Sequence, residues 1–300
     1  MTNFFVKDLG ELLKPITWFP PMWAFACGAV ASGSSFKDHI GLIFLGLLLT
    51  GPLVCASSQA VNDWFDREVD AINEPDRPIP SGRIPGNLGL KIAIIWSLLS
   101  ICVSTLLGYW GLIATILAVI LAWAYSMPPI RLKNNGWLGN AACGFSYEGL
   151  AWITGAIVMT NGTLPPWETV TLAILYSICA HGIMTLNDFK SISGDKLFGV
   201  KSLPVKLGVN LAAKLACLTM LVPQCVVVLL LFLWSANGFG LTLMGLIFLQ
   251  IGLMFNFLKD PVKRALFYSA AGVPILVGGM MVAAVALRNL DNNYKPEFVL

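Results

Sequence analysis

Charge is scarce in this sequence. Asp, Glu, Lys and Arg make up 12% of the 300 residues, whereas 57% are hydrophobic and the mean hydropathy is +0.76. Soluble globular domains carry about 25% charged residues, so the composition excludes an ordinary soluble domain. The formal net charge of +3 is spread over several loops, and we expect no nucleic-acid partner.

Residues for sulfur or imidazole chemistry are also few. The chain has two histidines, and none of its seven cysteines forms a Cys-x-x-Cys pair. The cysteines all lie within or beside apolar segments, so we interpret them as reduced packing residues without metal or disulfide roles. We also expect no secretory signal at the N-terminus.

What the chain does contain is long apolar runs. A helix of about 20 apolar residues crosses a bilayer. The sequence predicts nine such spans, at about 16–33, 39–59, 88–108, 111–127, 138–159, 168–186, 209–234, 237–257 and 264–287. The predicted fold class is therefore all-α, a polytopic helical bundle in the membrane.

The basic residues predict how this bundle is oriented. If the N-terminus is cytoplasmic, only Lys37, Arg288 and Lys295 fall on the outer side, so 19 − 3 = 16 Lys and Arg residues face inward. Residues 1–300 are then one domain. Residues 1–15 have apolar side chains at helical spacing and predict an interfacial helix, and residues 288–300 form a tail.

Much of the charge is gathered in two similar stretches, NDWFDREVDAINEPDRPIPSGR (62–83) and TLNDFKSISGDKLFGVKSLPVKLG (185–208). Each begins with Asn-Asp at the end of an apolar span, continues with acids, and places a basic residue shortly before a proline. Both lie on the same predicted face. The repetition predicts two halves, about 16–137 and 138–287, with polar ends facing one cavity.

Spacing gives these acids a chemistry. Asn62, Asp66 and Asp70 are four residues apart and share one helix face, with Asp63 about 100° round from Asn62. Asp188 and Asp195 are seven apart, two turns on one face if the helix continues. Carboxylates this close repel, and oxygen-only ligands favour Mg²⁺ completed by phosphate oxygens. An acidic, solvated loop would explain one stretch but not its repetition.

Basic residues beside the acids predict an anionic substrate, because carboxylates alone would repel a diphosphate. Pro128-Pro129 should end the helix of span 111–127 and direct two of these charges. The predicted diphosphate-binding residues are Arg77, Arg83, Arg131, Lys133, Lys190 and Lys201.

These motifs, together with YSMPPIRLK, resemble those of the UbiA-type intramembrane prenyltransferases, and KNNGWLGNAACGFSYEGLAW resembles the branch that makes bacteriochlorophyll. The resemblance covers about 14–287. It implies nine helices around a central cavity, and Mg²⁺-dependent transfer of a geranylgeranyl or phytyl group from its diphosphate to the propionate of bacteriochlorophyllide a. Chlorophyllide, a haem and a quinone-ring precursor stay open as acceptors, and a cation-coupled transporter is the rival from another class.

The resemblance also assigns residues. It implies metal ligation by Asn62, Asp63, Asp66 and Asp70 in the first motif and by Asp188 and Asp195 in the second, with Asn187 as a weaker ligand. Asp66, Asp70, Asp188 and Asp195 are the expected catalytic residues. Many family members have an additional acid in the second motif, where this chain has Lys190, Ser191 and Ser193.

Other candidates lie within the apolar spans, where ionisable groups are costly and usually functional. Glu148, Tyr147 and His181 are the predicted tetrapyrrole contacts, and His181 should face the cavity because it precedes Asp188 by seven residues. Ring faces of Trp64, Phe65, Tyr125, Tyr147 and Trp152 could stabilise a developing carbocation. We expect a cell membrane or intracytoplasmic photosynthetic membrane, a site near the cytoplasmic side, and pigment-biosynthesis or pigment-protein assembly partners.

Overall fold

The computed structural model describes residues 2–293, and within that range the chain is helical, without a β-strand. This confirms the predicted all-α fold class. The helices are α1 (Thr2–Leu13), α2 (Phe19–Ala31), α3 (Phe36–Leu48), α4 (Ala56–Asn73), α5 (Leu88–Ser104), α6 (Gly108–Ser126), α7 (Gly136–Gly144), α8 (Ala151–Met159), α9 (Trp167–Asp188), α10 (Ile192–Leu197), α11 (Leu203–Leu207), α12 (Val209–Leu233), α13 (Asn237–Lys259) and α14 (Pro261–Asn293).

Two pairs of helices are continuous through a wider, π-helical turn. Leu49–Cys55 joins α3 to α4, and Phe145–Leu150 joins α7 to α8. The first turn contains Pro52, which cannot donate a backbone hydrogen bond and is tolerated where the helix widens. The α3–α4 rod therefore continues past the predicted span 39–59 and holds the first acidic motif in helical form.

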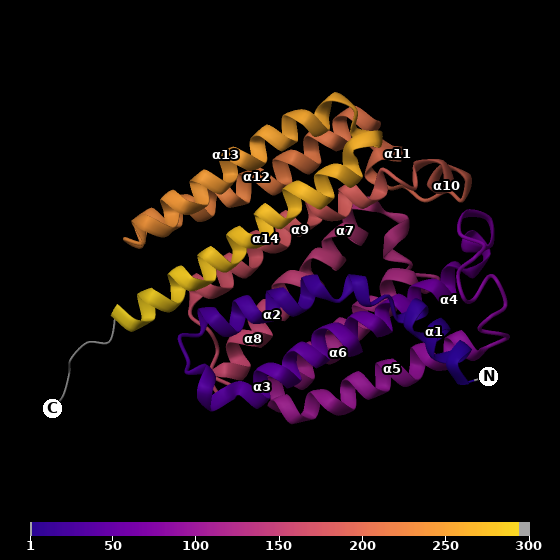
Figure 1. Cartoon of the computed structure of the whole chain (residues 1–300), viewed down its shortest axis with the longest axis horizontal. Helices are drawn as coiled ribbons and strands as arrows, with labels where there is room; N and C mark the ends of the chain where they lie inside the picture. The colour runs from indigo at the N-terminus through magenta and orange to yellow at the C-terminus, as the bar shows by residue number, and fades with distance from the viewer. Residues whose placement is uncertain (1, 294–300) are drawn as a thin grey trace.

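Six helical stretches of the described chain are long and apolar enough to cross a membrane: Phe36–Ile72, Leu88–Ser126, Trp167–Asp188, Val209–Leu233, Asn237–Lys259 and Pro261–Leu290. Leu88–Ser126 contains two predicted spans, because the chain turns at Gly108 (φ 81°) and α6 runs back beside α5 (Figure 1). The number of crossings, the orientation and the division into two halves stay predictions.

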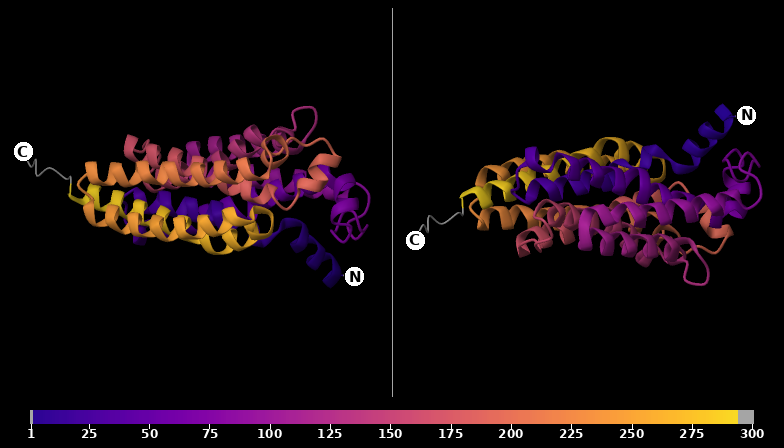
Figure 2. Two further views of the ribbon diagram at one scale, coloured as in Figure 1. Left: turned by 90° about the horizontal axis from the view of Figure 1, so that it is seen from above. Right: turned by 90° about the horizontal axis from the view of Figure 1, so that it is seen from below.

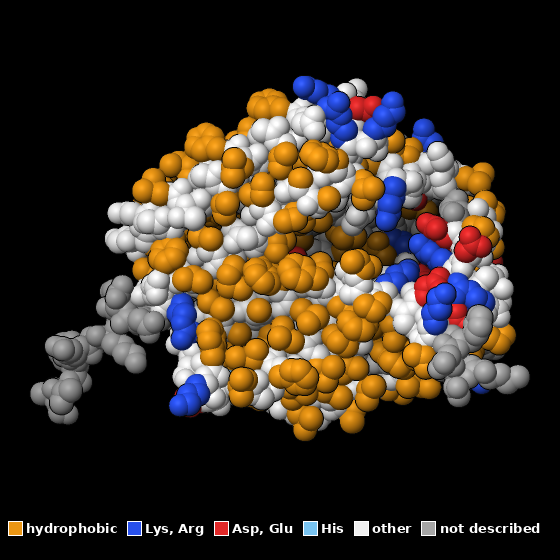
Figure 3. All heavy atoms as spheres, in the orientation of Figure 1, with side chains coloured by type: hydrophobic (Ala, Val, Ile, Leu, Met, Phe, Trp, Pro, Cys, Tyr) orange, Lys and Arg blue, Asp and Glu red, His pale blue; other side chains and the backbone are white. Residues whose placement is uncertain are grey.

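The long helices run roughly along one direction, and several short elements gather at one end of the bundle. Figures 1 and 2 place α1, the loop after α4, α10 and α11 at that end, and the far end of α14 at the other. Many hydrophobic side chains cover the outer face in Figure 3. This is the surface that lipid requires. Both acidic stretches thus lie at the same end of the molecule.

The N-terminal helix packs on the bundle. Leu12 and Leu13 of α1 are buried in a cluster with Ala56, Ala60 and Val61 of α4. Part of the apolar face that the sequence assigned to the membrane surface is therefore covered by protein. At the other terminus, residues 294–300 of the predicted tail, including Lys295, lie outside the described residues.

Candidate active site

A cavity of ≈ 980 Å³ lies between the helices, and both acidic stretches contribute to its wall. Figure 3 shows a hollow with Lys, Arg, Asp and Glu side chains at one end and hydrophobic side chains around the rest. The apolar part includes Leu49, Val54, Ala118, Leu121 and Leu150. The cavity therefore combines a charged end with an apolar interior.

The first acidic motif presents one helix face to this cavity. Asn62, Asp66 and Asp70 line it, as their spacing predicts, and Asn62 Nδ2 donates to Asp66 Oδ2 across 3.0 Å. Asp63 does not line it. Its side chain is 2% exposed and accepts a hydrogen bond from Lys14 Nζ at 2.5 Å. The helical period turns Asp63 away from the other three, so this expected metal ligand lies off the cavity wall.

Cations neutralise the acids of this face. Asp66 pairs with Lys133 and, at 2.9 Å, with Arg131, while Asp70 pairs with Arg77 at 2.7 Å. Helix α6 ends at Ser126, directly before Met127-Pro128-Pro129, as predicted, and the following turn carries Arg131 and Lys133 back to α4. Burial lowers the pKa of Lys133, and the nearby Asp66 carboxylate partly offsets this by raising it.

The second acidic motif is not one helix. Helix α9 ends at Asp188, and Asp195 belongs to the separate short helix α10, so the condition for their shared face fails. Asn187, Asp188 and Asp195 nevertheless all line the cavity, as does Lys190.

Hydrogen bonds hold these two carboxylates in place. Asn140 Nδ2 donates to Asp188 Oδ2 at 3.2 Å, and Asp195 Oδ2 accepts from Ser191 Oγ at 3.1 Å and from Ser202 Oγ at 2.6 Å. Burial raises the pKa of Asp195. Asp188 and Asp195 both reach the cavity although they belong to different helices, because the chain turns between α9 and α10.

Sequence reasoning missed Lys14, Asn140 and Ser202, which also line the cavity. Asn140 is 3% exposed within an apolar helix, and a polar residue in a predicted span is a signal that could have found it. Lys14 and Ser202 had no such signal, because their positions depend on how α1 and the loop before α11 pack.

Two predicted diphosphate-binding residues lie elsewhere. Arg83 pairs with Asp8 and, at 2.8 Å, with Glu11, both on α1, and it does not line the cavity. Lys201 is exposed, and its backbone N–H donates to Asn134 O at 3.0 Å while its side chain lies off the cavity wall. Both residues follow the acids closely in the sequence, but the loop conformations place them off the cavity wall.

Two of the three predicted tetrapyrrole contacts line the cavity, and the third does not. Tyr147 and Glu148 line the cavity from the π-helical turn Phe145–Leu150. The Tyr147 hydroxyl lies 2.9 Å from Ser58 Oγ, and Glu148 Oε2 is buried without a hydrogen-bond partner. His181 is not on the cavity wall. Its ring packs against Trp137 with centroids 5.7 Å apart, so the expectation that it faces the cavity is wrong.

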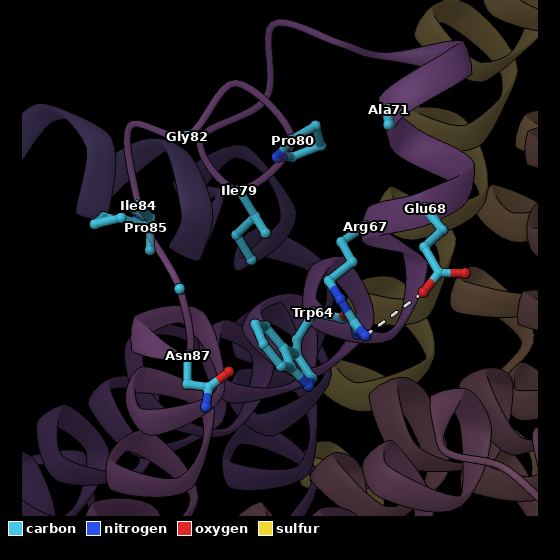
Figure 4. A pocket seen from close by; sticks show the side chains of 11 residues that line it. Trp64, Arg67, Glu68, Ala71, Ile79, Pro80, Gly82, Ile84, Pro85 and Asn87 are labelled. Carbon is cyan, nitrogen blue, oxygen red and sulfur yellow. Dashed lines mark hydrogen bonds and ion pairs between the residues drawn. The ribbon is translucent and has the colours of Figure 1, made fainter.

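Of the five aromatic candidates, Tyr125 and Tyr147 line the cavity. Trp152 stacks on Tyr176, and Phe65 packs against Trp123. Trp64 borders a separate pocket of ≈ 430 Å³ on another face of α4, where Arg67 lies over its ring at 4.4 Å (Figure 4). Glu68 lies there too, 3.6 Å from Arg67, and none of these three residues lines the larger cavity.

The acids fit a magnesium site that substrate completes. Within residues 2–293, no three His, Cys, Asp or Glu side chains lie close enough together to hold a metal by themselves. Mg²⁺ usually takes one or two carboxylates and completes its octahedron with water and substrate phosphates. Oxygen donors from two motifs line one cavity, and cations pair with the acids of the first motif. This arrangement matches that pattern better than an all-protein metal cage.

The fold and the site together define a class of protein: a helical membrane protein whose cavity suits a long apolar chain with an anionic head. Comparison with known families agrees with this class. Residues 17–273 match the UbiA prenyltransferase family, and the chain belongs to that family. It is therefore a membrane-embedded prenyltransferase.

Individual relatives are similar over most of the chain. It is 52% identical to the bacteriochlorophyll synthase 33 kDa chain of Rhodobacter capsulatus, over 93% of this chain and 92% of that protein. It is 41% identical to the chloroplastic chlorophyll synthase of Oryza sativa, over 92% of this chain and 75% of that protein.

Solved structures share the fold. A digeranylgeranylglyceryl phosphate synthase has a TM-score of 0.70 at 24% identity, over 93% of this chain and 98% of that one. A UbiA homolog from Archaeoglobus fulgidus, bound to GPP and Mg²⁺, has a TM-score of 0.63 at 19% identity, over 95% and 98%. At these identities the likeness shows the fold.

Proposed function

We propose that this protein transfers a geranylgeranyl or phytyl group from its diphosphate to the propionate carboxylate of bacteriochlorophyllide a, with Mg²⁺. A propionate oxygen forms a bond to C1 of the prenyl group, and the C1–O bond to diphosphate breaks with its electron pair leaving on the diphosphate. The observation that carries this proposal is one cavity with acids and cations at one end and apolar walls beyond them.

The charged end suits the diphosphate. Arg77, Arg131 and Lys133 line the cavity and already contact carboxylates, so their charges are directed inward before substrate arrives. Fixed cations beside the leaving oxygens stabilise the charge that develops as the C1–O bond weakens. Such stabilisation is large because it needs no reorganisation of solvent.

Asn62, Asp66 and Asp70 on one side and Asn187, Asp188 and Asp195 on the other are the residues that would hold magnesium. Bound there, the ion would supply Lewis-acid polarisation of the diphosphate oxygens. Asn140, Ser191 and Ser202 hold the carboxylates of Asp188 and Asp195 at the cavity wall.

The acceptor needs no strong base. A propionate has a pKa near that of Glu, about 4.3, and is ionised at neutral pH. The apolar walls exclude water, which would otherwise capture the allylic cation. Tyr125 and Tyr147 border the same space and can present ring faces to the developing charge.

Glu148 and Tyr147 are the proposed contacts for the tetrapyrrole ring. A buried carboxyl oxygen without a partner is costly inside a membrane helix, and Glu148 also borders the cavity, which supports a functional contact at this position. The 52% identity with a bacteriochlorophyll synthase supports this acceptor over a haem or a quinone precursor. We place the protein in a cell or intracytoplasmic photosynthetic membrane with the site near the cytoplasmic side.

The test compares acceptors directly. Purified protein is given Mg²⁺, geranylgeranyl diphosphate or phytyl diphosphate, and either bacteriochlorophyllide a or chlorophyllide a, and both the ester and the released diphosphate are measured. We expect stoichiometric release with bacteriochlorophyllide a. Faster esterification of chlorophyllide a would mean that chlorophyllide a, and not bacteriochlorophyllide a, is the acceptor. No diphosphate release with any acceptor would favour a transporter.

A further inference from the structure

A lysine outside both acidic motifs reaches the charged end of the cavity. Lys14 lies between α1 and the short helical turn Pro15–Thr17, and its side chain lines the cavity together with Arg77. Its Nζ is 2.5 Å from Asp63 Oδ1. Chain segments 49 residues apart thus meet beside the proposed diphosphate site.

Asp63 lies behind this lysine, off the cavity wall. Its side chain is 2% exposed, and besides Lys14 it has Arg77 Nη1 at 3.5 Å, while the same guanidinium contacts Asp70 at 2.7 Å. A buried carboxylate is stable only when cations compensate it. Asp63 therefore holds two cations that both border the cavity.

The backbone at Lys14 is also unusual. Four non-glycine residues of the described chain have a positive φ, and the two charged ones, Lys14 (47°) and Arg131 (36°), both line the cavity. Left-handed backbone is unfavourable for these residues and persists only where the surroundings enforce it.

The surroundings of Lys14 do enforce it. The neighbouring Leu12 and Leu13 are buried against α4, and Trp18 Nε1 donates to Leu13 O at 2.8 Å. The docking of α1 thus fixes the direction of the Lys14 side chain.

We propose that Lys14 binds the substrate diphosphate and that Asp63 is a positioning residue, which holds Lys14 and Arg77 toward it. The inference rests on the proposed function for the identity of the anion. A carboxylate of the acceptor is also an anion that Lys14 could bind. Lys14 lies beside Arg77, however, at the end of the cavity proposed for the diphosphate. The N-terminal segment then supplies a group of the active site.

The test measures binding of inorganic diphosphate with Mg²⁺ to the full-length protein, together with KM for geranylgeranyl diphosphate and for the acceptor. Lys14→Met should weaken diphosphate binding about tenfold, because it removes one charge-assisted hydrogen bond. It should raise the KM for geranylgeranyl diphosphate by a similar factor. Lys14→Arg should restore most of the binding. Lys263→Met, which removes an exposed lysine paired with Asp260 at 3.5 Å, is the matched control and should change neither.

Asp63→Asn should weaken diphosphate binding at least as much as Lys14→Met, and the double variant should be no worse than Asp63→Asn. A Mg²⁺ requirement that rises in Asp63→Asn with unchanged diphosphate affinity would identify a metal ligand and overturn the proposal. So would a Lys14→Met effect confined to the acceptor KM. Because inorganic diphosphate needs no acceptor, loss of the proposed pigment activity would leave this result readable.

Discussion

Arg131 and Asp66 form an ion pair across the charged end of the cavity, with 2.9 Å between Nη2 and Oδ1, although 65 residues separate them in the sequence. Lys133 joins the same carboxylate. The pairing links the first acidic motif on α4 to the turn after α6. It keeps both cations directed into the cavity, where a diphosphate would meet them.

The acids that face the cavity should be essential. We expect Asp66→Asn or Asp70→Asn to lower turnover by about 100-fold or more, because each removes a carboxylate from the proposed magnesium site. Ester formation over a range of Mg²⁺ concentrations checks this, with thermal unfolding to verify folding. Glu68→Gln on another face of α4 is the control and should keep full activity. Wild-type turnover in either Asp variant would remove the acids from the mechanism.

Two lysines near the motifs should behave differently. Lys133→Met should raise the KM for geranylgeranyl diphosphate by about tenfold, because it removes a cation from the cavity wall. Lys201→Met should leave that KM within about twofold, since this side chain is exposed and lies off the wall. Steady-state kinetics with the donor varied distinguishes them. Equal effects would mean that Lys201 reaches the substrate.

The acceptor should depend on Glu148 rather than on His181. Glu148→Leu removes a carboxyl that borders the cavity, and we expect the bacteriochlorophyllide KM to rise about fivefold or more with little change in the donor KM. His181→Phe preserves the ring packing against Trp137 and should leave both constants unchanged. Kinetics with the pigment varied is the measurement. A selective loss of pigment affinity in His181→Phe would return that histidine to the site.

The Mg²⁺ dependence of the activity should change when Asn140 is replaced. Chelation of divalent ions should stop diphosphate release, and added Mg²⁺ should restore it. Asn140→Ala removes the hydrogen bond to Asp188 and should raise the Mg²⁺ concentration for half-maximal activity about tenfold, as removal of an outer partner of a metal ligand does.

The exposed Thr242→Ala variant, which removes only a hydrogen bond to Gly238 O, is the comparison and should show the wild-type Mg²⁺ dependence. An unchanged dependence in Asn140→Ala would show that Asp188 needs no such support.

Much of the site could be predicted from local spacing. Asn62, Asp66 and Asp70 share a helix face because the helical period places every fourth residue nearly above the first, and that holds whatever surrounds the helix. The same period explains why Asp63 points elsewhere. The seven-residue spacing of Asp188 and Asp195 failed as a guide because the helix ends between them.

The sequence alone determined that this is an all-helical membrane protein with two acidic groups, because apolar length and charge distribution are properties of segments. Only the tertiary structure decided which cations reach the cavity. Lys14, Arg77, Arg131, Lys133 and Lys190 line it, while Arg83 pairs with α1 and Lys201 is exposed. The physical reason is that a long basic side chain takes the nearest available carboxylate. Which one is nearest depends on how loops and helices pack, and sequence proximity does not fix that.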